Sequence, residues 1–139
     1  MRVFALLLSS YVLLSNTLYA ADDKPAPSLQ DRLKAAALDK EPFTLVVEVS
    51  IKPGSIEKVE KLMLDAAKQT NKEPGCLLYD VHRNPETPGK YVFLERFRGV
   101  AGLDAHLAAQ YTKDLLAAFG SESSEPVKIM LLNQMKQNP

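Results

Sequence analysis

The sequence predicts an α+β domain whose strands and helices follow one another in the order β-α-β-β-α-β. Alternating apolar residues mark four segments as strands, and apolar residues at three- and four-residue spacing mark two others as helices. Pro-Gly pairs, which favour turns, separate several of these segments. This order is the ferredoxin-like arrangement, and we expect it to form one domain over residues 43–134.

The first twenty residues have the features of a signal peptide. Arg2 precedes a mostly apolar run, and Leu18-Tyr19-Ala20 offers a cleavage site that ends in a small residue. The run is shorter than the roughly 20 apolar residues that a membrane-spanning helix needs. We therefore expect residues 1–20 to be removed from an exported protein that is periplasmic or secreted. The alternative is a retained N-terminal anchor.

Residues 21–42 are expected to be a leader that contains one short helix. Ser28 and Asp31 have the spacing of a capping box, in which two side chains bind the free backbone groups at a helix start. Leu29 and Leu33 lie one helical turn apart on the same face. We expect this helix to pack against the edge of the domain.

The first half of the domain is predicted to be a strand, a helix and a second strand. Apolar residues alternate over 43–51, which indicates a strand. Ser55 is placed to cap a helix that continues to Thr70 and has an apolar stripe. The turn at 73–75 ends this helix, and 76–83 is the second predicted strand.

The second half repeats this plan as a strand, a helix and a final strand. A loop at 84–89 contains two prolines and a glycine, and it predicts a hairpin that leads into a strand over 91–98. Apolar spacing predicts one helix over 103–119. A final strand is expected over 127–133, followed by a tail at 135–139.

The predicted strands are apolar on both faces. In the last strand, Val127, Ile129 and Leu131 lie on one face, and Met130 and Leu132 lie on the other. A sheet with helices on one face alone normally alternates apolar and polar residues. A second copy of the sheet is the simplest cover for the other face, so we expect a two-fold homodimer.

The composition excludes some classes of partner. The chain has 17 basic and 17 acidic residues, which gives no electrostatic reason to expect binding to nucleic acid or to a membrane surface. The single cysteine, Cys76, has no second cysteine with which to form an internal disulfide. Its position at the start of an apolar strand favours a buried thiol over a reactive one.

Candidate site residues lie on the third predicted strand and the second predicted domain helix. Alternation places Tyr91, Phe93, Glu95 and Phe97 on one strand face. If this face meets the helices, Glu95 is buried among aromatic rings, and His106 is its candidate partner. Such a pair could accept a proton from a phenol or an enol. It could equally be a structural pair that ties the helix to the sheet, and both interpretations stay open.

Two tyrosines extend the candidate pocket, and no cofactor is expected. Tyr79 could add a hydroxyl to the cavity, and Tyr111 could close it or simply pack. Two histidines on separate elements, without acidic residues at ligand spacing, do not predict a metal site. The chain has no glycine-rich phosphate motif and no Gly-x-Ser-x-Gly, so we expect no tightly bound nucleotide.

Over residues 43–133 the chain resembles the antibiotic biosynthesis monooxygenase-type (ABM) domain. The resemblance is carried, in order, by Lys52-Pro53-Gly54, Glu73-Pro74-Gly75-Cys76 with Tyr79, Leu94-Glu95-Arg96-Phe97 and Ala105-His106-Leu107. The family implies a dimeric α+β barrel with a pocket between sheet and helices in each subunit. Its members include cofactor-independent oxygenases of quinols or polyketide phenols, haem-degrading enzymes and a signal-molecule isomerase.

The chain departs from this family at two places. Members commonly have a tryptophan where Phe97 stands, and haem-degrading members use an asparagine on the strand that here carries Val47 and Glu48. Haem breakdown is therefore not expected.

Three functions remain as hypotheses for the same cavity. The first is a cofactor-independent monooxygenase of a quinol or phenol, with His106 as base and Glu95 as the group that orients it. The resemblance and the strand pattern together give the expected pocket walls, which are Tyr79, Phe97, Phe93, Tyr91 and Tyr111. The alternatives are a non-catalytic exported protein that binds an apolar or phenolic small molecule, and a cofactor-free isomerase.

Overall fold

The computed structural model describes residues 26–135. The predicted signal peptide at 1–20, residues 21–25 of the leader and residues 136–139 of the tail lie outside this described part of the chain. Within residues 26–135, no helix is both long and apolar enough to cross a bilayer.

Four strands form one antiparallel sheet in the order β2-β3-β1-β4. The predicted strands are confirmed to within one residue of each bound, as β1 (Phe43–Ser50), β2 (Cys76–Arg83), β3 (Lys90–Phe97) and β4 (Lys128–Asn133). The central pairs set the register, with Leu45 of β1 opposite both Glu95 of β3 and Leu131 of β4. The domain is an α+β fold with the ferredoxin-like order of elements.

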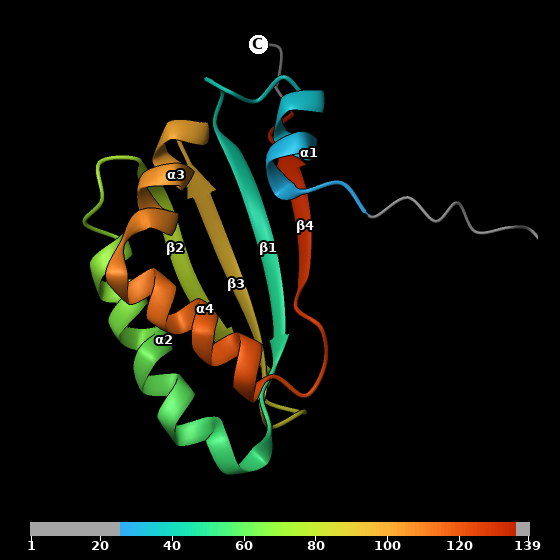
Figure 1. Ribbon diagram of the computed structural model, residues 1–139, viewed down its shortest axis with the longest axis vertical. Coiled ribbons are helices and arrows are strands. Elements are labelled where there is room, and N and C mark those ends of the chain that lie inside the picture. Colours follow the sequence, from blue (N-terminus) through green and yellow to red (C-terminus); the bar gives the residue numbers. More distant parts are fainter. Residues whose placement is uncertain (1–25, 136–139) are drawn as a thin grey trace, which may run out of the picture.

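The helices lie on one face of this sheet (Figure 1). They are α1 (Leu29–Ala35), α2 (Ile56–Thr70), α3 (Val100–Ala108) and α4 (Gln110–Glu122), and a short 3₁₀ turn, η1 (Pro53–Ser55), precedes α2. Alternate residues of β1 and β3 point into the core under the helices, which is the face that carries Phe43, Leu45, Phe93, Glu95 and Phe97. Burying the apolar side chains of this face is the main source of stability.

The single helix predicted over 103–119 is wrong, because two helices occupy this region. Ala109 has extended backbone angles (φ −67°, ψ 141°), so α3 ends before it and α4 begins after it. In one continuous helix, His106 and Thr112 would point about 120° apart. The break instead brings the Thr112 hydroxyl to 3.4 Å from His106 Nδ1.

Ser55 does not cap α2 as predicted. Its hydroxyl instead donates a hydrogen bond to Glu122 at the end of α4, over 2.7 Å. η1 supplies the preceding turn, with Pro53 at its first position. The Ser55–Glu122 contact therefore joins the start of α2 to the end of α4.

The predicted leader helix is confirmed as α1, which lies beside β4 and β1 (Figure 1). Ser28 and Asp31 form the expected capping box. Leu33 is fully buried, and the Arg32 guanidinium donates to the Ile129 carbonyl of β4 over 3.2 Å. α1 is therefore attached to the edge of the sheet by both packing and a hydrogen bond.

The opposite face of the sheet carries apolar side chains and no helix within the described residues. Met130 is 54% exposed, Leu132 and Leu78 are also exposed, and Val92 and Leu94 are half-buried. The outer face of the sheet in a single chain is therefore apolar, as the strand pattern predicted. The homodimer that would cover this face stays a prediction.

A close approach of two glycines fixes the start of α3 against the chain before β2. A Cβ atom on Gly75 would lie 2.5 Å from Gly102 Cα, and one on Gly102 would lie 2.8 Å from the Gly75 carbonyl oxygen. Only glycine fits at both positions without a backbone shift. This contact sets the position of α3, and hence of His106.

Candidate functional site

A cavity of about 670 Å³ lies between the inner face of the sheet and helices α1, α3 and α4. Its volume falls in the range of small-molecule sites. Most of its wall is apolar, with Leu29, Leu45, Val47, Leu103, Leu107, Leu115, Leu116, Phe119, Val127 and Ile129 among the lining residues. Three of the predicted site residues also line it, namely Tyr79, Glu95 and His106.

Glu95 occupies the middle of the sheet, on the floor of this cavity. It is only 8% exposed, and no hydrogen bond to its carboxyl group is formed within residues 26–135. Loss of hydration raises the pKa of Glu95 from its ordinary 4.5 to about 8, with a further contribution from the negative charge of Glu73. Near neutral pH this side chain is therefore a carboxylic acid that can donate a hydrogen bond.

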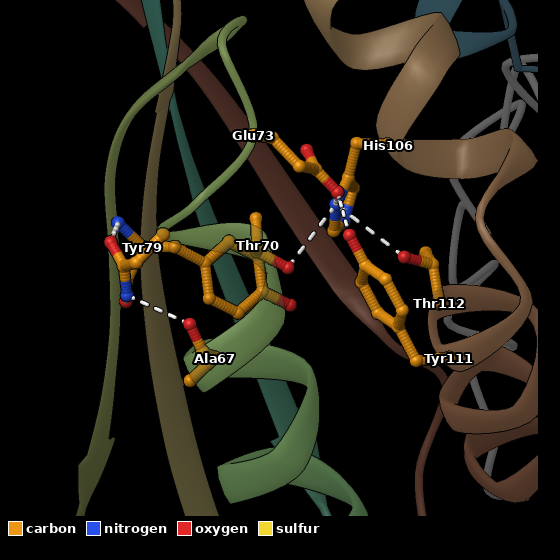
Figure 2. A network of polar contacts seen from close by, with 8 residues as sticks. Ala67, Thr70, Glu73, Tyr79, His106, Tyr111 and Thr112 are labelled. Carbon is orange, nitrogen blue, oxygen red and sulfur yellow. Dashed lines mark hydrogen bonds and ion pairs between the residues drawn. The ribbon is translucent and has the colours of Figure 1, made fainter.

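His106, from α3, is held over the sheet by polar contacts on one side of its ring. It is 3% exposed, and its Nδ1 lies 3.1 Å from Glu73 Oε1 and 3.4 Å from the hydroxyls of Thr70 and Thr112. Figure 2 shows these groups meeting between the end of α2 and the start of α4. Nε2 has no hydrogen-bond partner within the described residues, so it is the ring nitrogen that remains for a ligand.

The contact with Glu73 defines the protonation of the ring. A carboxylate only accepts, so Nδ1 carries the proton and Nε2 keeps a lone pair in the neutral form. Burial lowers the pKa of His106, and the Glu73 carboxylate opposes this shift in part. The ring is therefore neutral near pH 7 and can accept a proton at Nε2.

The carboxylate partner of His106 is Glu73, and the predicted pairing with Glu95 is not among the contacts of the described residues. Glu73 Oε1 also accepts a short hydrogen bond from the Tyr111 hydroxyl, while Glu73 Oε2 is buried and has no partner in the part of the chain that the structure describes. From the sequence, Glu73 is assigned to a turn and to one motif of the family resemblance, without a role in the site. The acidic residue just past the end of a helix, three residues after the buried Thr70, was the available signal.

Tyr79 is positioned by the chain that precedes it. The Asn71 side chain accepts from the Tyr79 backbone N–H over 3.2 Å and donates to the Tyr79 carbonyl over 2.8 Å. The Tyr79 ring lies 5.3 Å from the His106 ring, centroid to centroid. Burial raises the pKa of Tyr79, so its hydroxyl stays protonated.

The other predicted pocket residues do not line the cavity. Phe97 packs against the back of the His106 ring at 5.3 Å, and Phe93 packs edge-on against Tyr79. Tyr111 instead holds Glu73. Tyr91 lies at the far end of β3, where its hydroxyl donates to Glu60 over 2.6 Å. Phe97, Phe93 and Tyr111 therefore support residues of the site from behind, and Tyr91 lies away from it.

These observations define a small α+β protein with a mostly apolar cavity, whose lining in residues 26–135 includes a neutral histidine and a buried carboxyl group that has no hydrogen-bond partner among those residues. The sequence matches the family described as antibiotic biosynthesis monooxygenase over residues 42–118, and the chain belongs to this family. The match covers the sheet from β1 to β3 and most of the helices, together with Glu73, Glu95 and His106.

Two solved structures that carry the family's name and one further protein are similar to this chain. The crystal structure of a candidate antibiotic biosynthesis monooxygenase from Caulobacter crescentus is 26% identical, with a TM-score of 0.66 over 74% of this chain and 98% of that one. A second structure, of an antibiotic biosynthesis monooxygenase, is 26% identical, with a TM-score of 0.64 over 68% of this chain and 99% of that one. An uncharacterized protein from Synechocystis sp. is 24% identical over 77% of this chain and 71% of its own length.

Proposed function

We propose that this protein is a cofactor-independent monooxygenase that acts on a quinol or another oxidisable phenol. The observation that carries the proposal is an apolar cavity lined by both a neutral histidine, His106, whose Nε2 has no hydrogen-bond partner among the described residues, and an uncharged acid, Glu95. Membership of the monooxygenase family supports the same reaction class. The substrate and the independence from a cofactor are part of the proposal.

In this proposal, His106 is the catalytic base. Its Nε2 takes the proton of a quinol hydroxyl, and the Glu73 carboxylate stabilises the imidazolium that forms. The quinolate is electron-rich enough to reduce O₂ directly. One oxygen atom is added at an unsubstituted ring carbon and the other leaves as water, so that quinol and O₂ give hydroxyquinone and water.

Glu95 has a different role from the one that the sequence suggested. Because Glu73 already orients His106, the protonated Glu95 is free to donate a hydrogen bond to the second oxygen of the substrate. The apolar wall would exclude water from the reactive anion. Tyr79 would close the cavity beside the ring of His106.

Oxygen consumption by the purified protein, with a panel of quinols, tests the proposal. We expect uptake above the buffer rate for the wild type and a fall of about 10²- to 10⁴-fold in His106→Ala, the usual range for loss of a general base. His82→Ala, which removes the exposed histidine of β2, should keep wild-type uptake. A folded wild type without uptake across the panel would refute the oxygenase and favour a binding protein or an isomerase.

We also propose that the protein is exported, on the basis of residues 1–20. Expression of the full chain in a host with a secretory pathway, followed by intact-mass measurement, tests this. We expect a mature protein that begins at Ala21 in the exported fraction. A full-length chain that stays in the membrane fraction would instead support the retained anchor.

A further inference from the structure

The cavity has a polar side and an apolar side, and the sheet register orders them. Across the sheet, Tyr79 of β2 is opposite Glu95 of β3, which is opposite Leu45 of β1, which is opposite Leu131 of β4. His106 lies over the β2–β3 side, against the Tyr79 ring. The polar groups that could contact a reacting ring therefore lie on the β2–β3 side of the cavity.

The β1–β4 side of the cavity offers only apolar side chains from the sheet. Val47 of β1 is opposite Ile129 of β4, and both line the cavity with Leu116 of α4. The loop after α4 adds Ser123, Ser124 and Glu125 along one edge. Two strand spacings, about 10 Å, separate β3 from β4, so the cavity extends well beyond a ring held at Glu95.

α1 closes this apolar side. Its Leu29 lines the cavity and its Leu33 is buried in the core, as is Leu38 just after the helix. Arg32 of α1 is hydrogen-bonded to β4. α1 precedes residues 42–118, which match the family. The wall that α1 provides is therefore outside the residues that match the family model.

We propose that α1 builds a subsite for an apolar chain, and that the substrate is a phenol or quinol that carries such a chain. The phenolic head lies between His106 and Glu95, and the chain crosses Val47 and Ile129 to reach Leu29. The assignment of the phenolic head depends on the proposed function, whereas the assignment of the chain subsite depends only on the apolar wall. An unbranched alkyl or prenyl-like substituent has the right chemistry, because this side of the cavity has no charged side chain from the sheet or from α1.

Calorimetric titration with 4-alkylphenols, from ethyl to octyl, tests the subsite without any turnover. Each methylene buried against the wall should tighten binding about fourfold. The gain should end at the chain length that reaches α1. An affinity that does not change with chain length would overturn the proposal.

Two variants of Leu29 identify α1 as the wall. Leu29→Gln should weaken binding of the longer alkylphenols and leave ethylphenol unchanged, and Leu29→Phe should move the preferred chain to a shorter length. Leu64→Gln makes the same chemical change on α2, where the side chain is 67% exposed and outside the cavity, and should match the wild type. Equal chain-length dependence in Leu29→Gln and Leu64→Gln, with helical circular dichroism intact, would overturn the assignment.

The two proposals fail separately. Chain-dependent binding without oxygen uptake would leave the subsite in place and remove the oxygenase. Turnover of short quinols, with no effect of chain length on binding, would do the reverse.

Discussion

Replacing Glu95 with glutamine should make the protein more stable, and the gain should grow with pH. Below pH 4.5 the carboxyl group is protonated in both the folded and the unfolded chain, so its ionisation contributes no difference. Between pH 4.5 and about 8 the unfolded chain releases this proton and the folded chain keeps it. Stability of the wild type therefore falls through this window as pH rises, and it stops falling above pH 8.

The size of the effect follows from the pKa of about 8 that burial gives to Glu95. Each pH unit in the window costs about 1.36 kcal/mol, which amounts to roughly 3 kcal/mol at pH 7. Glutamine has the shape of the protonated acid and does not ionise. Its amide adds a fixed cost or gain, so the pH dependence of the difference is the informative quantity.

Urea unfolding followed by circular dichroism, at a fixed protein concentration and at pH 4, 6 and 8, measures this difference. Glu48→Gln removes the same group from the exposed side of β1 and controls for the loss of one charge. A difference between wild type and Glu95→Gln that is constant from pH 5 to 8 would refute the reasoning. Glu95 would then ionise normally, and it could not act as the hydrogen-bond donor proposed above.

Three further perturbations test other contacts. Glu73→Gln should lower the pKa of His106 by about one to two units, because a charge-assisted hydrogen bond of about 1.5–3 kcal/mol is lost, and NMR titration of the ring protons measures this. Gly102→Ala should destabilise the fold by about 1–3 kcal/mol in thermal unfolding, because its Cβ would meet the Gly75 carbonyl. Met130→Lys should convert the expected homodimer to a monomer in light scattering, because it places a charge on the exposed apolar face.

Each of these perturbations has a matched control in the chain. His82 is exposed and gives the second histidine signal, which should not move in Glu73→Gln. Gly54→Ala adds a Cβ that meets nothing within 4 Å and should be nearly neutral. Leu64→Lys changes an exposed residue of α2 on the helical side and should leave the oligomeric state unchanged. A response in the control equal to that in the test variant would contradict the corresponding contact.

The strands could be predicted from the sequence because their signal is local. Alternation in β1 and β3 assigns each side chain to a face, and burial of Phe93, Glu95 and Phe97 follows that assignment. Alternation does not give position along the strand, however. Tyr91 shares the face of Phe97 but lies six residues away, about 20 Å, and so contacts Glu60 instead of the cavity.

The break at Ala109 and the role of Glu73 could not be predicted in the same way. Alanine has the highest helix propensity, so neither Ala108 nor Ala109 signals an interruption. His106 and Thr112 contact each other across the break, and no local pattern announces that contact. Glu73 lies in a turn whose proline and glycine dominate the local pattern, and its partner His106 is 33 residues away. Only the folded chain shows that these two side chains meet.

The polar cluster around His106 comes from just two stretches of chain, residues 70–79 and 106–112. Most of the β2–β3 hairpin lies between them, so closure of the hairpin brings the two stretches together. Closing a loop of this size has an entropic cost that is recovered only when the distant contacts form. We therefore expect the cluster to assemble late in refolding, so that a chain that has regained its sheet signal does not yet hold His106 in place.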